Sequence, residues 1–195
     1  GVCQPLCLEA CGNGYALVME DFSGISLQQY VTHHPLSLVE TLGIAIQMAD
    51  VLNGLCQHHV IHKDIKPANI IIDPNSRRIQ LIDFSIASVL PRELQSIQTP
   101  DALEGTLAYL SPEQTGRMNR GIDYRSDFYG LGVTLYKLLT GVLPFQSSNP
   151  IELVHCHMAQ VPRPPDQINS QIPPVLSAIV LKLMAKNAED RYQSA

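Results

Sequence analysis

The chain has 195 residues, of which 45% are hydrophobic and 16% charged, and its formal net charge at pH 7 is −5. This composition indicates a folded globular domain and excludes a disordered chain. The acidic balance argues against nucleic acid as a partner, because surfaces that bind phosphate backbones are basic. No apolar run approaches the roughly 20 residues that span a bilayer, and no basic leader precedes an apolar core. We therefore expect a cytoplasmic protein without a membrane segment in this chain.

The cysteines and histidines do not predict a metal site. The five cysteines are odd in number and are interpreted as reduced thiols. Cys3, Cys7 and Cys11 are evenly spaced, but the spacing matches no zinc pattern, and in a strand they would form an ordinary apolar stripe on one face. His155 and His157 lie two positions apart in a predicted helix, where they would not face each other.

The first half of the chain is predicted to contain strands, one long helix and a hairpin. The apolar run "YALVME" (15–20) follows Gly-Asn-Gly, which is typical of a hairpin turn. Apolar residues recur at helical spacing over 37–59, with Ser37 as N-cap and Glu40 completing a capping box. The predicted apolar stripe of this helix consists of Leu38, Leu42, Ala45, Met48 or Ala49, Leu52 and Leu55.

Two short aliphatic runs, "NIIID" (69–73) and "RIQLIDF" (78–84), are joined by a Pro-Asn-Ser turn and predict a small hairpin. No sustained period follows over 85–115, and an irregular stretch of that length inside a domain is usually functional.

Helices are predicted again in the last third of the chain. The segment "DFYGLGVTLYKLLTG" (127–141) is apolar nearly all round and predicts a buried central helix that ends at Gly141. Two further helices are predicted over 150–160 and 173–186, with a proline-rich connector at 161–173 between them.

A charged loop, "HKDIKPAN" (62–69), lies between two apolar runs and carries the chemistry of the chain. Asp64 and Asn69 are on this loop, and Asp83 ends the second strand of the hairpin that follows, so Asn69 and Asp83 could present two oxygen ligands side by side. Oxygen ligands suit Mg²⁺, which usually shares them with substrate phosphates. A carboxylate, an amide and the ammonium of Lys66 around a metal are what phosphoryl transfer requires. Taken singly, Asp64 could be a loop-capping carboxylate, Asn69 a turn residue and Asp83 a strand-end cap.

The loop resembles the catalytic loop of protein kinases, and "DFS" (83–85) resembles their metal-binding Asp-Phe-Gly motif. The resemblance implies that Asp64 is the catalytic base, that Asn69 and Asp83 bind Mg²⁺, and that Lys66 contacts the transferred phosphate. His62 is interpreted as a packed support of the loop rather than a catalyst.

Further segments resemble the same family in the same order. "VMEDFSG" (18–24) resembles the hinge that receives the adenine of ATP, with Met19 in the gatekeeper position and Glu20, Asp21 and Phe22 offering backbone groups.

"GTLAY" (105–109) resembles the peptide-docking loop and "SPE" (111–113) the Ala-Pro-Glu motif that closes the activation segment. By the same resemblance Asp127 holds the backbone of the catalytic loop, and Arg191 pairs with Glu113.

Lys66 and Thr106 indicate the serine/threonine subclass, with Thr106 part of the catalytic apparatus. The segment 104–141 is similar to bacterial, especially cyanobacterial, kinase domains that precede an ATPase-like module, GAF domains and a histidine kinase. Such covalently linked signalling modules are therefore expected in the full-length protein.

The chain departs from the family in three places. Lys63 replaces the usual Arg of the catalytic loop, which questions control by activation-loop phosphorylation, because Lys cannot form the bidentate contact of Arg. Ser85 replaces the Gly of Asp-Phe-Gly and is expected to adopt its backbone angles only with strain. The glycine-rich phosphate loop and the strand lysine are absent before Tyr15, so the chain is interpreted as a fragment that is itself inactive.

The expected fold is α+β and protein-kinase-like: a remnant of N-terminal lobe strands and hinge at 1–23, and a mostly helical C-terminal lobe at 24–195, truncated before the end of its last helix. The expected function is transfer of the γ-phosphoryl group of Mg-ATP to a serine or threonine of a protein in signal transduction. The alternative is a catalytically inactive, pseudokinase-like scaffold. A small-molecule kinase is disfavoured because such enzymes generally lack a peptide-docking segment.

Overall fold

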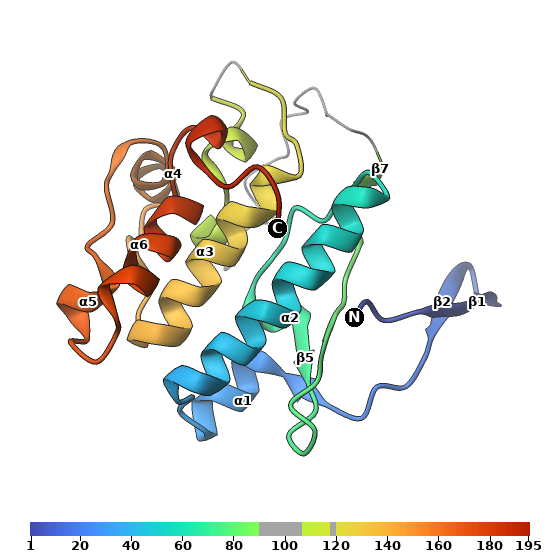
Figure 1. Ribbon diagram of the computed structural model, residues 1–195. Coiled ribbons are helices and arrows are strands. Elements are labelled where there is room, and N and C mark those ends of the chain that lie inside the picture. Colours follow the sequence, from blue (N-terminus) through green and yellow to red (C-terminus); the bar gives the residue numbers. More distant parts are fainter. Residues whose placement is uncertain (90–106, 118–119) are drawn as a thin grey trace.

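The computed structural model describes residues 1–89, 107–117 and 120–195. The predicted site residue Thr106 lies outside the described residues, as does most of the irregular stretch that the sequence predicts after Ser85. The expected α+β architecture is confirmed. Helices form the body of the molecule, and short strands lie at one side of it (Figure 1).

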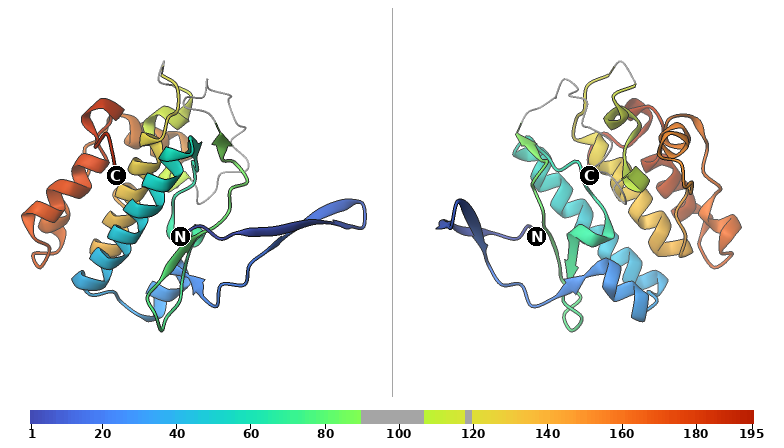
Figure 2. Two further views of the ribbon diagram at one scale, coloured as in Figure 1. Left: turned by 45° about the vertical axis from the view of Figure 1, so that its right-hand side comes forward. Right: turned by 180° about the vertical axis from the view of Figure 1, so that it is seen from behind.

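The predicted N-terminal hairpin is confirmed. Strand β1 (Pro5–Cys11) pairs antiparallel with β2 (Gly14–Met19), and the turn between them uses Gly12 at a positive φ of 59°. Most side chains of the hairpin are exposed on both faces, and the hairpin projects from the body of the molecule (Figure 2). The predicted apolar stripe of cysteines does not form as a unit, because Cys3 is buried whereas Cys7 and Cys11 are exposed.

The first three residues lie along strand β6 (Ile79–Leu81) rather than in the hairpin. Leu81 N donates to Gly1 O at 2.9 Å, and Cys3 N donates to Leu81 O at 3.2 Å. Strand β3 (Ile25–Ser26) and helix α1 (Leu27–His33) follow the hairpin, and the sequence analysis did not predict either of them. Ser26 caps α1 by accepting a hydrogen bond from Gln29 N at 3.2 Å.

Helix α2 (Leu38–Gln57) has the predicted capping box: Glu40 N donates to Ser37 Oγ, and Ser37 N donates to the Glu40 carboxylate. The spacing of the predicted stripe was right but its angular position was partly wrong, because Leu42 is 38% exposed. The buried side chains of α2 are Thr41, Ile44, Met48, Val51, Leu52 and Leu55.

Helix α2 is also, among the described residues, long and apolar enough to cross a membrane by length and composition. The sequence has no uninterrupted apolar run of that length, so no such helix was expected. One such helix is weak evidence for a membrane span, because core helices pass the same test. Its buried face packs on helix α3 and strands β4 and β6.

The strands after α2 are short and mostly buried. Strand β4 (Val60–Ile61) pairs antiparallel with β7 (Ser88–Val89). Strand β5 (Ile70–Ile72) lies between β3 and β6, and its antiparallel pairing with β6 confirms the predicted hairpin. A 3-10 turn, η1 (Pro67–Asn69), leads directly into β5.

Helix α3 (Arg125–Thr140) is the predicted central helix; the residues of its first three turns are buried, and it ends at Gly141 with a φ of 78°. Two glycines bring other elements close to its axis. A Cβ at Gly130 would stand 3.1 Å from the backbone oxygen of Ile65, and a Cβ at Gly132 would stand 2.8 Å from the side chains of Leu183 and Met184. The catalytic-loop candidate thus packs on one side of α3 and the C-terminal helix on another.

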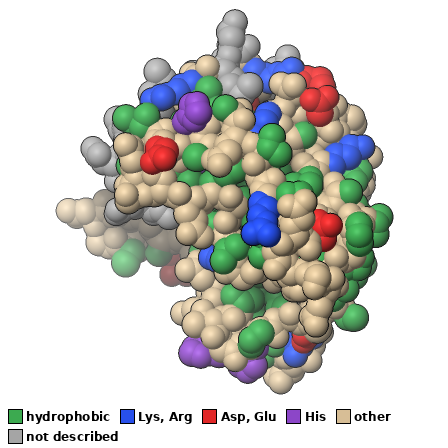
Figure 3. All heavy atoms as spheres, turned by 90° about the vertical axis from the view of Figure 1, so that its left-hand side faces the viewer, with side chains coloured by type: hydrophobic (Ala, Val, Ile, Leu, Met, Phe, Trp, Pro, Cys, Tyr) green, Lys and Arg blue, Asp and Glu red, His purple; other side chains and the backbone are tan. Residues whose placement is uncertain are grey.

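The remaining elements surround α3 (Figure 1). Helices α4 (Pro150–Ala159) and α6 (Pro174–Leu183) confirm the two predicted helices, and a short α5 (Pro165–Ile168) lies in the predicted proline-rich connector. Three 3-10 turns complete the described chain: η3 (Leu107–Tyr109), η4 (Pro112–Thr115) and η5 (Ala188–Asp190). On the described part of the face towards α5 and α6, charged and hydrophobic side chains are interspersed (Figure 3).

Candidate active site

The backbone of the loop after β4 is held by a buried carboxylate of α3. Asp127 accepts hydrogen bonds from His62 N at 2.8 Å and from Lys63 N at 2.7 Å. Burial raises the pKa of Asp127 to about 7, and the two backbone donors act in the opposite direction. The two bonds fix the start of the loop against the central helix, as the resemblance implied for Asp127.

Asp64 is nearly buried and its two oxygens have different surroundings. Its Oδ2 accepts from Lys66 Nζ at 2.7 Å and from Asn69 Nδ2 at 2.9 Å. Its Oδ1 is buried and accepts no hydrogen bond from any described residue. A buried oxygen without a donor costs free energy, so natural proteins keep such atoms mainly where they have a use. The loop therefore presents one carboxylate oxygen that is ready to accept a proton.

Asn69 ties the loop to the strand that leads to Asp83. Its side-chain nitrogen also donates to Asp64 O at 3.0 Å, and its backbone oxygen accepts from Ile82 N at 2.9 Å. Because Nδ2 is engaged by Asp64, the amide oxygen of Asn69 is the atom left for a ligand. Asp83 follows Ile82 directly and is exposed.

The strain expected at Ser85 lies at Asp83 instead. Asp83 has a φ of 66°, in the left-handed region, whereas Ser85 is not among the described residues with a positive φ. Ser85 N donates to Asp83 Oδ1 at 3.3 Å. Hydrogen bonding by Ser85 lowers the pKa of Asp83, so this carboxylate stays charged. The prediction of strain at Ser85 was wrong because the backbone reversal occurs two residues earlier.

The side chain of His62 is fully buried and contacts the backbone next to Asp83 and at Asp64. Its Nδ1 accepts from Asp64 N at 3.2 Å, and its Nε2 is 3.0 Å from Ile82 O. The ring of Phe84 packs edge-on against it, with centroids 4.6 Å apart. Burial lowers the pKa of His62, which favours a neutral imidazole. These contacts agree with a supporting role for His62.

The candidate hinge lies beside β6. Met19 ends β2, and the Glu20 carboxylate accepts from Gln4 N and from Gln80 Nε2, both at 3.0 Å. Asp21 is exposed and Phe22 is half-buried. The Glu20–Gln80 contact, which the sequence analysis missed, joins the segment after β2 to the strand that leads to Asp83.

The segment after η3 is attached to the same loop. Ser111 and Gln114 form a capping box at η4, and Gln114 Nε2 donates to Lys63 O at 2.8 Å. Lys63 has a φ of 70°, which turns its backbone towards these partners. Sequence reasoning did not identify Gln114, although a Ser three residues before a Gln is the signature of a capping box.

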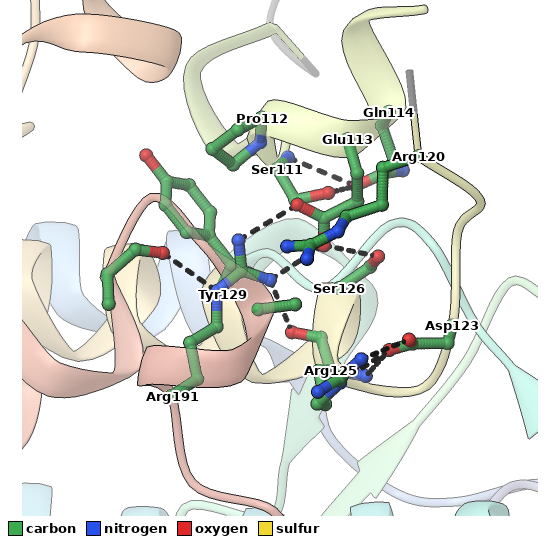
Figure 4. Close-up of polar contacts among 12 residues, drawn as sticks. Ser111, Pro112, Glu113, Gln114, Arg120, Asp123, Arg125, Ser126, Tyr129 and Arg191 are labelled. Carbon is green, nitrogen blue, oxygen red and sulfur yellow. Dashed lines mark hydrogen bonds and ion pairs between the residues drawn. The ribbon is translucent and has the colours of Figure 1, made fainter. Parts of the chain in front are cut away.

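A buried ion pair anchors the end of this segment to the C-terminus (Figure 4). Arg191 donates to both carboxylate oxygens of Glu113, at 2.6 and 2.8 Å, and to Arg125 O at 2.8 Å. Ser126 Oγ adds a hydrogen bond of 2.6 Å to Glu113. Burial alone would raise the pKa of Glu113, but Arg191 and Ser126 hold it below its ordinary value. The expected pairing of Arg191 with Glu113 is confirmed.

The comparisons with known proteins agree with this geometry. The family model for the protein kinase domain matches residues 8–195. The chain belongs to the protein kinase domain family.

Its curated relatives are serine/threonine kinases. The chain is 39% identical over 180 residues to the serine/threonine-protein kinase PknB of Mycolicibacterium smegmatis, covering 92% of this chain and 28% of that protein. The serine/threonine-protein kinase PknB of Mycobacterium tuberculosis is 37% identical over 180 residues, again covering 92% of this chain and 28% of that protein. A probable serine/threonine-protein kinase PknB of Corynebacterium glutamicum is 35% identical over 184 residues, again with 92% and 28% covered. The chain thus has the sequence of a serine/threonine kinase domain and spans little more than a quarter of the length of these relatives.

Proposed function

We propose that the protein transfers the γ-phosphoryl group of Mg-ATP to a serine or threonine hydroxyl of a protein substrate. The observation that carries this proposal is the buried Oδ1 of Asp64, which no described residue bonds, while Lys66 and Asn69 hold Oδ2. An oriented carboxylate with one oxygen that no described residue bonds is suited to receive the proton of a hydroxyl nucleophile.

Each of the site residues has a separate role in this transfer. Asp64 Oδ1 accepts the hydroxyl proton as the hydroxyl oxygen forms its bond to phosphorus and the bond from phosphorus to the ADP oxygen breaks. Lys66, whose ammonium lies 2.7 Å from Asp64, stabilises negative charge on the transferred group. Asp127 and His62 keep the loop in place. Thr106, by resemblance, contributes from the peptide-docking side.

The residues present fit Mg²⁺. Asn69 keeps an amide oxygen and Asp83 keeps a charged carboxylate, and hard oxygen ligands of this kind bind Mg²⁺ together with phosphates. The bound ion would neutralise charge on the ATP phosphates. Asn69 and Asp83 are the residues that we propose to hold it.

Adenine would be received by the segment after β2. We assign Met19 to the gatekeeper position and Glu20, Asp21 and Phe22 to the backbone contacts. In the same proposal residues 1–23 belong to the N-terminal lobe and hinge, and residues 24–195 to the C-terminal lobe. Downstream signalling modules on the same polypeptide and a cytoplasmic location complete the proposal.

The test is phosphate transfer from labelled Mg-ATP by the protein encoded by the complete reading frame. Asp64→Asn removes the proton acceptor while keeping its size, so we expect turnover to fall by about 10²- to 10⁴-fold with little change in melting temperature. Asp50→Asn on the exposed face of α2 is the matched control and should leave turnover unchanged.

Wild-type protein that transfers no more phosphate than Asp64→Asn would contradict the kinase proposal and favour the scaffold. Unfolding of Asp64→Asn would contradict the assignment of Asp64 as a catalytic rather than a structural residue.

A further inference from the structure

Helix α4 carries a buried histidine that the proposed mechanism does not use. His157 has no exposed surface. Its Nδ1 is 2.9 Å from the hydroxyl of Tyr129 on α3, and the ring of Phe145 packs edge-on at a centroid distance of 5.1 Å. Its Nε2 makes no hydrogen bond with any described residue.

The surroundings of His157 determine which of its nitrogens carries the proton. Lys186 donates to the backbone oxygens of Cys156 and His157, at 3.3 and 2.9 Å, and lies 4.5 Å from the centre of the Phe145 ring. Burial together with this neighbouring charge lowers the pKa of His157 to about 4, so the imidazole is neutral. We assign the ring proton to Nε2, the tautomer in which the Tyr129 hydroxyl donates to Nδ1 and the backbone groups of Ala108 and Leu107 are acceptors on the other side of the ring.

The proton on Nε2 faces the segment that follows Thr106. The backbone groups of Ala108 and Leu107 lie near the imidazole and act to raise its pKa, although neither completes a hydrogen bond with Nε2. Helix α4 packs against η3, which contains both residues, and α3 also packs against it. Lys137 of α3 also donates to the Tyr109 hydroxyl at 3.2 Å. The turn therefore contacts two helices, and a buried ring nitrogen lies near its backbone.

We propose that His157 is a positioning residue for the protein substrate: its imidazole places the backbone of Leu107 and Ala108, in the segment that the kinase resemblance assigns to peptide docking. The inference rests on the proposed kinase function and adds a residue that sets the docking surface. A buried donor that no described acceptor reaches is costly, and closure of the turn onto Nε2 when a peptide docks would satisfy it. Peptide binding and this hydrogen bond then favour each other.

The role predicts a particular kinetic signature. In the protein from the complete reading frame, His157→Leu keeps an apolar side chain and removes the donor, whereas His157→Gln keeps an amide donor near the position of Nε2. The probe is the serine- or threonine-containing peptide that the wild type phosphorylates best in an arrayed peptide library. We expect His157→Leu to raise KM for this peptide about tenfold, the effect of losing one buried hydrogen bond. KM for ATP and kcat at saturating peptide should stay unchanged, and His157→Gln should recover most of the loss.

Two further variants separate positioning from general damage. His155→Leu, on the exposed side of the same helix, should leave all three constants unchanged. If His157→Leu does not fold, Tyr129→Phe provides the second route, because it removes the hydroxyl that orients Nδ1 and keeps the ring. Amide hydrogen exchange at Ala108, Tyr109 and Leu110 should be faster in His157→Leu than in His157→Gln.

An unchanged peptide KM in folded His157→Leu, or an equal rise in the KM for ATP, would overturn this inference while leaving the kinase function intact. Wild-type protein that transfers no phosphate above Asp64→Asn would instead overturn the proposed function. The two failures are therefore distinguishable.

Discussion

The catalytic-loop region and the N-terminal hairpin are held in opposite ways. The loop around Asp64 is fixed by buried polar side chains, of which Asp127 comes from a distant part of the chain and Asn69 from the loop itself. The β1–β2 hairpin has a complete backbone ladder, yet large apolar side chains such as Leu8 and Tyr15 are 63% and 77% exposed. Backbone pairing alone thus forms a strand pair, whereas the site is fixed by side chains buried against α3. Four experiments test this contrast.

The largest effect is expected from the buried ion pair. Arg191→Leu should lower the free energy of unfolding by about 3–5 kcal/mol, because it leaves the Glu113 carboxylate buried without its cation. Arg120→Leu is the matched control: it removes a partly exposed pair with Glu189 and should cost at most about 1 kcal/mol. Urea denaturation measures both variants, and equal losses would show that burial does not distinguish the two pairs.

Truncation of one leucine in each region compares their packing. Leu27 of α1 is fully buried, so Leu27→Ala should cost about 2–5 kcal/mol. Leu17 of the hairpin is 58% exposed, and Leu17→Ala should change stability by no more than about 0.5 kcal/mol. The same denaturation experiment applies. A cost for Leu17→Ala as large as that for Leu27→Ala would mean that the hairpin is packed in solution.

Mild acid should act on the helical region through His157. The pKa of this group is lowered from 6.5 to about 4 by burial, so between these values the unfolded chain binds a proton that the folded chain does not. Stability is therefore lost as the pH falls from about 6.5 to about 4, by on the order of 2 kcal/mol. The denaturation midpoint should depend less steeply on pH across this range in His157→Leu than in the wild type. Identical pH dependence in the two proteins would refute the assignment of this effect to His157.

The smallest effect on the whole molecule is expected in the hairpin turn. Gly12 has a φ of 59°, and Gly12→Ala should strain the turn by roughly 1 kcal/mol. Because the hairpin opens without exposing the core, the cost should appear as faster amide exchange in β1 and β2, with little change in the midpoint of global unfolding. A matching fall in the global midpoint would show that hairpin and body unfold together.

The sequence predicted those elements well whose formation depends on residues that are neighbours in the chain. The capping box of Ser37 and Glu40, the β5–β6 hairpin and the end of α3 at Gly141 depend on neighbouring residues, and the structure contains all three. Helix α1 and strand β3 were missed because they are short and follow immediately on the glycine at position 24. Helical spacing located the stripe of α2 but not its angular position, since Leu42 lies outside the buried face.

Several contacts that build the site join residues far apart in the sequence, and no local pattern predicts them. Asp127 and His62 are 65 positions apart, and Arg191 and Glu113 are 78 apart, so only resemblance to a family could pair them from the sequence. The open oxygen of Asp64, the left-handed backbone of Asp83 and the Gln114–Lys63 contact are consequences of packing and appear only in three dimensions. Thr106 lies outside the described residues, and its role stays a prediction.

The two glycines of α3 set a limit on how this domain can change over evolution. At Gly130 the missing side chain leaves room for the Cβ and the backbone oxygen of Ile65, next to the proposed catalytic base, and at Gly132 it leaves room for Leu183 and Met184. A larger residue at the first position must displace the loop around Asp64, and one at the second must displace the C-terminal helix. A relative with a side chain at position 130 and an intact Asp64 is therefore expected to carry a compensating change at the position of Ile65, which makes this pair of positions a place to look for coupled substitutions.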